Sequence, residues 1–174
     1  TVVSSAGTLS ISDIQGEGAD SPYIGQNVTT SGYVTARAEY GFFIQDAEAS
    51  WSGIWILDYG NQSVNIGDEV EVTGMVEEYY NLTEIDVTSG NVSVLSTGNP
   101  LYNPILIDSV EEAYESVLVT VSGVCDGAPN EYGEWTLSGI WIDDLMYEFT
   151  PVVGEPYTIT GPLYYSYDEY KVEP

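Results

Sequence analysis

Apolar and polar residues alternate along most of this chain in short runs, the period expected of β-strands that bury one face. In the first half, such runs predict strands at 28–36, 42–45, 54–57, 69–76 and 84–95. The second half predicts strands at 116–125, 134–137, 139–143 and 156–161, with a final stretch that ends at residue 172. Residues 1–14 read as an extended arm or a first strand, and 108–115 hold the one plausible helical turn.

The order of these runs repeats. GDEVEVTG at 67–74 matches GEPYTITG at 154–161, and SGIWILD at 52–58 matches SGIWIDD at 138–144. Matches in one order at a nearly constant offset indicate a duplicated domain. The segment STGNPLYNP at 96–104 holds two Asn-Pro steps and a glycine, which favours a linker. We therefore predict two all-β domains, 1–97 with an extended N-terminal segment and 98–174, each a small Greek-key barrel of about five strands with little helix.

Several strings in the first half resemble a known family. ISDIQGEG, SPYIGQNVTTSGYVTA, YGFFIQD, SGIWI and IGDEVEVTGMVEEYYNLTEI look like the tandem OB-fold modules beside the catalytic domain of large secreted bacterial nucleases, in the endonuclease/exonuclease/phosphatase superfamily. AYESVLVTVSG, in the second half, is similar to the next module. The resemblance implies two tandem OB-like barrels and a nucleic-acid-binding role, and no nuclease-site residue maps onto this chain.

Charge opposes that role. The chain has 28 acidic residues against Arg37 and Lys171, a net charge of −26, and each half carries an equal share of acids and one base. Affinity for nucleic acids depends on lysines and arginines that neutralise phosphates. The composition thus disfavours nucleic acid and anionic membranes as partners, and no apolar run is long enough to span a membrane. It favours solubility or, as the alternative, the binding of multivalent cations.

The residues needed for common catalytic sites are missing. With no histidine, triads and histidine general bases are excluded, and a usual zinc site is not expected. Adjacent acids are too frequent to identify a glycosidase pair. The lone Cys125 shares the parity of buried valines, which predicts a core position. We therefore predict that the chain is not an enzyme.

Calcium is the one cofactor that the sequence suggests. Oxygen ligands cluster in two places, and the alternative for each is a solvated acidic loop, since no EF-hand pattern is present. The candidate ligands are Glu77, Glu78, Glu84 and Asp86 in one group and Asp126, Asn130 and Glu131 in the other.

Glycosylation motifs and tyrosines point outside the cell. Four N-x-[ST] motifs give Asn27, Asn61, Asn81 and Asn91 as glycosylation candidates, which indicates an extracellular or cell-surface protein. Thr1 in place of Met suggests a processed mature form or an excised segment. Fifteen tyrosines suit protein interfaces and sugar contacts. The candidate binding-surface aromatics are Tyr33, Phe42, Phe43, Tyr79, Tyr80, Tyr164 and Tyr165.

Three hypotheses follow. The first is a non-enzymatic structural protein that self-associates into a surface fibre or filament through β-strand and aromatic contacts. The second is a nucleic-acid-binding accessory module of a secreted nuclease. The third is a carbohydrate-binding module that uses tyrosine and tryptophan, with glycans as partners.

Overall fold

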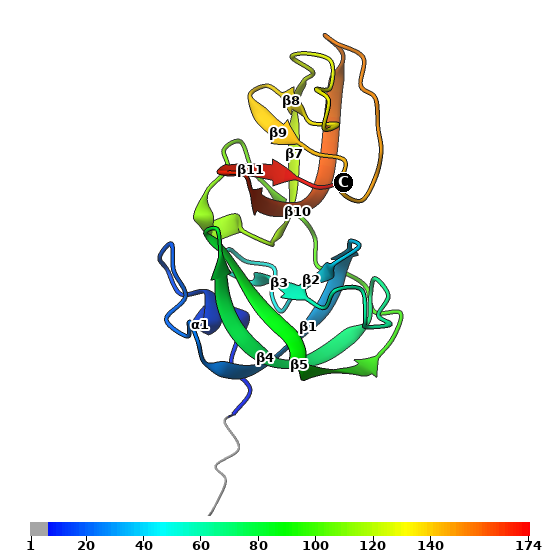
Figure 1. The fold of residues 1–174 in the computed structure, drawn as a ribbon. Coiled ribbons are helices and arrows are strands. Elements are labelled where there is room, and N and C mark those ends of the chain that lie inside the picture. The colour runs from blue at the N-terminus through cyan, green and yellow to red at the C-terminus, as the bar shows by residue number, and fades with distance from the viewer. Residues whose placement is uncertain (1–6) are drawn as a thin grey trace, which may run out of the picture.

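A computed structural model describes residues 7–174, and the first half forms a closed five-stranded barrel (Figure 1). Around the barrel the strands follow the order β1-β2-β3-β5-β4 and close between β4 and β1. All neighbouring pairs are antiparallel except β3 with β5, which is parallel. The strands are β1 (Asn27–Arg37), β2 (Gly41–Gln45), β3 (Gly53–Leu57), β4 (Glu69–Tyr79) and β5 (Leu82–Ser96).

Alternation builds the barrel core. Val28 and Val34 of β1, Val70 and Val72 of β4, and their counterparts on the other strands turn inward and are buried, as the period of two requires. All five strands that the alternation predicts in this half are confirmed, and β4 and β5 run a few residues further than expected.

A short helix that the sequence interpretation missed packs into this core. α1 (Ile11–Gln15) buries Ile11 and Ile14 completely. Ser10 caps it: its hydroxyl accepts the Asp13 N–H at 3.1 Å, while the Asp13 carboxylate accepts from the Ser10 N–H. The expectation of an extended arm or strand for 1–14 is therefore wrong for 11–14, and residues 1–6 lie outside the described part of the chain.

The second half repeats the strand order of the first (Figure 1). Its sheet runs β6-β7-β10-β11-β9-β8, with β9 parallel to β11 and β10 antiparallel to both β7 and β11. β7 and β8 would have to pair to close it, and in residues 7–174 they meet through one bridge, Cys125 with Leu137. The elements are β6 (Ile105–Leu106), η1 (Glu112–Tyr114), β7 (Leu118–Val124), β8 (Trp135–Leu137), β9 (Ile140–Ile142), β10 (Pro156–Ser166) and β11 (Glu169–Val172).

Matched positions in the two halves also share local geometry. A Cβ on Gly74 would collide with the Asp86 carbonyl oxygen, and a Cβ on Gly161 would collide with that of Glu173. Each glycine therefore lets β4 or β10 cross closely over the strand that follows it. The described chain is mostly β, which confirms the all-β prediction, and the helical turn expected at 108–115 is the short 3₁₀ helix η1. None of the described helices is long and apolar enough to cross a membrane.

The second sheet packs on the β2–β3 side of the barrel (Figure 1). Phe43 and Trp55 point out of the barrel, yet both are buried, because Tyr164 of β10 covers them at ring-centroid distances of 5.6 and 5.4 Å. Hydrogen bonds cross the same boundary: the Leu118 N–H donates to Gln45 Oε1 at 3.0 Å, and the Trp51 N–H to the Ala113 carbonyl at 2.7 Å. The two sheets are thus joined by apolar and polar contacts together.

A candidate site: the tyrosine cleft

A cleft of about 680 Å³ opens beside the contact between the two sheets. We call it the tyrosine cleft, because five tyrosines contribute to its walls. Its lining comes from the β4–β5 hairpin, the β10–β11 hairpin and the segment after β9. The lining residues are Tyr79, Tyr80, Leu82, Asp143, Leu145, Tyr164, Tyr165, Ser166, Tyr167, Asp168 and Glu173.

Two hairpin turns of the same kind present tyrosines to this cleft. β4 and β5 are joined through Tyr80 and Asn81, with φ of 50° and 67°, and β10 and β11 through Tyr167 and Asp168, with φ of 52° and 64°. Two-residue turns with both φ angles positive favour asparagine, aspartate and glycine, so a tyrosine at the first position is strained. Both of these strained tyrosines line the cleft.

At the buried end of the cleft lies a carboxylate without a side-chain partner. Glu173 follows β11 and is 0% exposed, and among the described residues no side chain donates a hydrogen bond to its carboxylate, which faces the backbone N–H of Leu145. Its backbone is fixed, because its N–H donates to the Pro162 carbonyl at 3.1 Å. Burial, followed by the charge of Asp143, raises the pKa of Glu173 to about 8.

The neighbouring cation is already engaged. Lys171 is almost fully buried, and its ammonium donates to Glu134 and, at 3.3 Å, to Asp143. The same ammonium lies 5.4 Å from the centre of the Tyr167 ring. Lys171 thus uses its charge on other carboxylates and on a cleft tyrosine.

More acids are buried between the sheets, close to the cleft. Glu115 accepts the Thr83 N–H at 3.0 Å through one oxygen, and burial together with Glu112 raises its pKa to about 9. Burial and the charge of Glu77 raise the pKa of Glu84 to about 7. Neither side chain lines the cleft, so both belong to the contact between the sheets.

The aromatic candidates from the sequence divide into two groups. Tyr79 and Tyr80 are exposed and lie edge to face at 4.8 Å, and with Tyr164 and Tyr165 they line the cleft. Tyr33 lies elsewhere, 5.6 Å from the ring of Tyr102.

The expectation is wrong for Phe42 and Phe43, which are 0% exposed. Phe42 belongs to the barrel core, and Phe43 is covered by the second sheet. Neither ring can stack on a base or a sugar. Tyr167 is not among the aromatic residues selected from the sequence, but it also lines the cleft. Its position in the repeat, which is equivalent to that of Tyr80, could have identified it.

The two proposed calcium groups do not come together as ion cages. Glu77 and Glu84 are cross-strand neighbours, while Glu78 accepts from the Ser21 N–H and the Thr83 hydroxyl. In the other group, Asp126 accepts the Gly139 N–H, and Asn130 bonds within its own loop. Across residues 7–174, no three histidine, cysteine or acidic side chains are placed to hold a metal ion. Asp86 and Glu131 add no third ligand.

The glycosylation candidates all lie on the surface. Asn27, Asn61, Asn81 and Asn91 are exposed, which leaves their modification as a prediction. Asn81 occupies the tip of the β4–β5 hairpin, beside Tyr80 of the cleft. Cys125 is buried, as its strand parity predicts.

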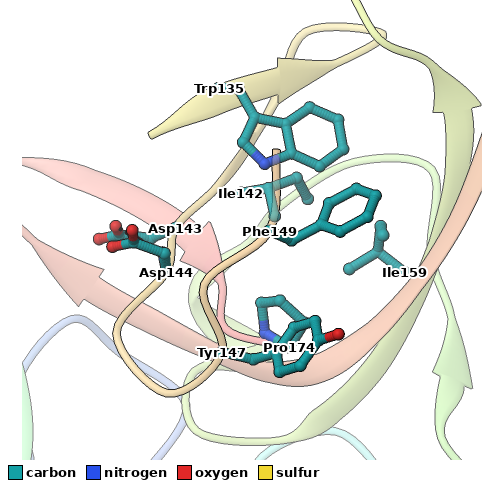
Figure 2. A pocket seen from close by; sticks show the side chains of 8 residues that line it. All are labelled: Trp135, Ile142, Asp143, Asp144, Tyr147, Phe149, Ile159 and Pro174. Carbon is teal, nitrogen blue, oxygen red and sulfur yellow. Dashed lines mark hydrogen bonds between the residues drawn. The ribbon is translucent and has the colours of Figure 1, made fainter. Parts of the chain in front are cut away.

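A second, smaller pocket of about 180 Å³ lies within the second sheet. Figure 2 shows Trp135, Phe149, Ile142 and Ile159 around it, while the carboxylates of Asp143 and Asp144 point to one side, away from the rings. The ring of Trp135 lies 6.3 Å from that of Phe149, which holds the segment after β9 onto the sheet. This pocket extends the apolar core, and Asp143, Asp144 and Tyr147 are the polar residues of its lining.

No protein-family model and no curated protein sequence matches this chain, so the geometry of the site carries the functional interpretation.

Proposed function

We propose that this chain is a non-enzymatic, extracellular interaction protein that assembles with copies of itself into a surface fibre. The observation that carries the proposal is the difference between the two sheets. The first is a closed barrel without edges, whereas the second leaves β6 at an edge within the described chain, while β8 meets the end of β7 through the bridge of Cys125 with Leu137. An exposed edge offers unpaired backbone groups to a further strand.

Apolar side chains are exposed around the open sheet. Leu106 of β6 is 75% exposed, and Val124, Val152 and Val153 are also exposed. An incoming strand that contributes apolar residues would bury them. Residues 1–6, TVVSSA, include two valines and are the segment that we propose for this role.

The same proposal holds that both halves are OB-like barrels related to the modules of secreted nucleases. The strand order β1-β2-β3-β5-β4, repeated as β7, β8, β9, β11 and β10, supports a pair of five-stranded Greek-key barrels. The burial of Phe42 and Phe43 and the net charge of −26 argue that the nucleic-acid ligand has been lost.

Assembly is tested on the full chain and on a variant that lacks residues 1–6, by light scattering and electron microscopy. We expect elongated polymers for the full chain and monomers for the deletion. Leu106→Lys should raise the concentration needed for assembly at least tenfold, because it charges the open edge. Ile66→Lys is the control, since Ile66 is comparably exposed but lies on the barrel side. A full chain that stays monomeric at high concentration, with and without calcium, contradicts the proposal.

The tyrosine cleft favours a second candidate function, the binding of carbohydrate. Aromatic rings and acceptor oxygens are the groups that proteins use on sugars, and the cleft holds five tyrosines with three acids. A glycan array should give hits that the double variant Tyr79→Ala/Tyr80→Ala loses and Tyr132→Ala keeps. Tyr132 is the control because it is exposed and lies outside the cleft. An array without hits rejects this candidate.

A further inference from the structure

We propose that the tyrosine cleft binds a lysine or arginine side chain of another protein, with Glu173 as the counter-ion. This inference is independent of fibre assembly, because it uses neither the edge strands nor residues 1–6. Three features of the cleft carry it: a carboxylate without a side-chain partner, the tyrosine faces, and the absence of a free cation in the described chain.

The Glu173 carboxylate is the first feature. It is 0% exposed and lines the cleft, and among residues 7–174 no side chain donates a hydrogen bond to either oxygen, which leaves the Leu145 backbone N–H as the donor that faces it. Burying a carboxylate without partners is costly, and a group in that position either stays protonated or takes up a cation. An ammonium or guanidinium group supplies both the opposite charge and the hydrogen-bond donors.

The tyrosine rings are the second feature. Cations are attracted to aromatic faces within about 6 Å, and aromatic cages around ammonium groups are a known use of that attraction. The cleft already contains one such contact, since the Lys171 ammonium lies 5.4 Å from the centre of the Tyr167 ring. Tyr79, Tyr80, Tyr164 and Tyr165 offer further rings around the same space.

Charge selects a cation over a neutral ligand. Asp143 and Asp168 line the cleft with Glu173, and Lys171 is held by Glu134 and Asp143. The whole chain carries a charge of −26, which raises the local concentration of cationic partners and their association rate.

The basic side chains of these 174 residues are already engaged. The sequence contains two basic side chains, and both are in ion pairs: Arg37 with Asp58 at 3.5 Å, and Lys171 with its two acids. A second copy of this chain has no other lysine or arginine to offer. The cleft volume of about 680 Å³ exceeds what one amine fills, so we assign the ligand to a basic segment of a partner protein.

The test is calorimetric titration of the full chain at low salt with an acetylated, amidated tri-lysine peptide. The neutral probe is the same peptide with its three side-chain amines acetylated. We expect binding of the charged peptide and at least tenfold weaker binding of the neutral one. Glu173→Gln should weaken binding at least tenfold. Asp108→Asn removes the same charge from an exposed site outside the cleft, so it should change the affinity less than twofold.

Tyr80→Ala gives a second route if Glu173→Gln does not fold. Tyr80 is 77% exposed, and Tyr80→Ala should weaken binding of the charged peptide about tenfold, whereas Tyr132→Ala should not change that affinity. If Glu173→Gln and Asp108→Asn weaken binding of the charged peptide equally, the attraction is nonspecific and the cation site is rejected. The cation site is also rejected if the acetylated peptide binds as tightly as the charged one. If butylammonium binds as tightly as the peptide, a single amine is sufficient and the assignment of the ligand to a partner protein is rejected. Binding of neutral glycans that survives Glu173→Gln but not Tyr79→Ala/Tyr80→Ala rejects the cation and retains the carbohydrate candidate.

Discussion

At the residue scale, two glycines at matched positions decide whether each sheet can bend. Gly74 and Gly161 both end the repeated G-x₆-G string, and at each of them the next strand's carbonyl oxygen occupies the space of a side chain. A backbone neighbour cannot move aside as a flexible side chain can. The requirement for glycine is therefore steric in both halves.

Gly74→Ala and Gly161→Ala should each destabilise the fold by about 1–3 kcal/mol, the usual cost of overpacking. Gly127→Ala is the matched control, because a Cβ there meets no atom within 4 Å. Urea unfolding of the three variants measures the difference. Equal stability of Gly161→Ala and Gly127→Ala would show that β10 can shift away from Glu173.

At the element scale, strands β2 and β3 are buried on both faces, which an isolated barrel of this size does not require. Their inner residues belong to the barrel core, and their outer residues Phe43 and Trp55 are covered by Tyr164 of β10. A strand buried on both faces loses the alternation that reveals orientation. This is why the sequence pattern placed these strands correctly but assigned Phe43 to a binding surface.

Tyr164→Ala should loosen the contact between the two sheets. It removes the ring that packs on Phe43 and Trp55, and loss of a well-packed aromatic ring costs about 3 kcal/mol. We expect faster proteolysis within 97–104, the stretch between β5 and β6, and a lower unfolding temperature. Tyr132→Ala, at an exposed position, should change stability by less than about 0.5 kcal/mol. Unchanged proteolysis of Tyr164→Ala would mean that the polar contacts suffice to hold the sheets together.

At the scale of the whole molecule, charge sets how stability depends on pH. Glu84, Glu115 and Glu173 are buried, and their pKa values rise from 4.5 to about 7, 9 and 8. Desolvation is the largest cause for all three. The charged neighbours of Glu173 are Asp143, Asp144 and Lys171, those of Glu115 include Glu112 and Glu78, and those of Glu84 are Glu77, Asp86 and Glu78.

The folded chain should therefore be more stable at pH 5 than at pH 9. Each of these groups keeps its proton in the folded state after the unfolded chain has lost it, so its stabilisation is complete below pH 4.5 and disappears as pH rises through the folded pKa. The slope is at most about 1.4 kcal/mol per pH unit for each group. Urea unfolding between pH 5 and 9 measures it, and Glu115→Gln should reduce the slope.

Measurements at high salt distinguish the contribution of the buried acids to this pH dependence from the contribution of the net charge of −26. Repulsion among the exposed acids also lowers the stability of the fold as the pH rises. About 1 M salt, however, shortens the range of that repulsion to about 3 Å. Dependence on pH that persists in high salt comes from the buried acids. A flat profile in high salt contradicts their raised pKa values.

The all-β class, nearly all strand positions and the repeat can be predicted from the sequence, because they depend on local alternation and on glycines at fixed spacing. The sequence also held the signal for α1, since Ser10 and Asp13 form a capping box. Which side chains meet depends on the tertiary structure. Tyr79 is far in the chain from Tyr164 and Glu173, and the packing of β10 against the barrel brings it into one cleft with them. Burial of Phe43 depends on the packing of one sheet on the other, and burial of the Glu173 carboxylate depends on the packing of the segment after β11 against β10 and the segment after β9, contacts that no local pattern records.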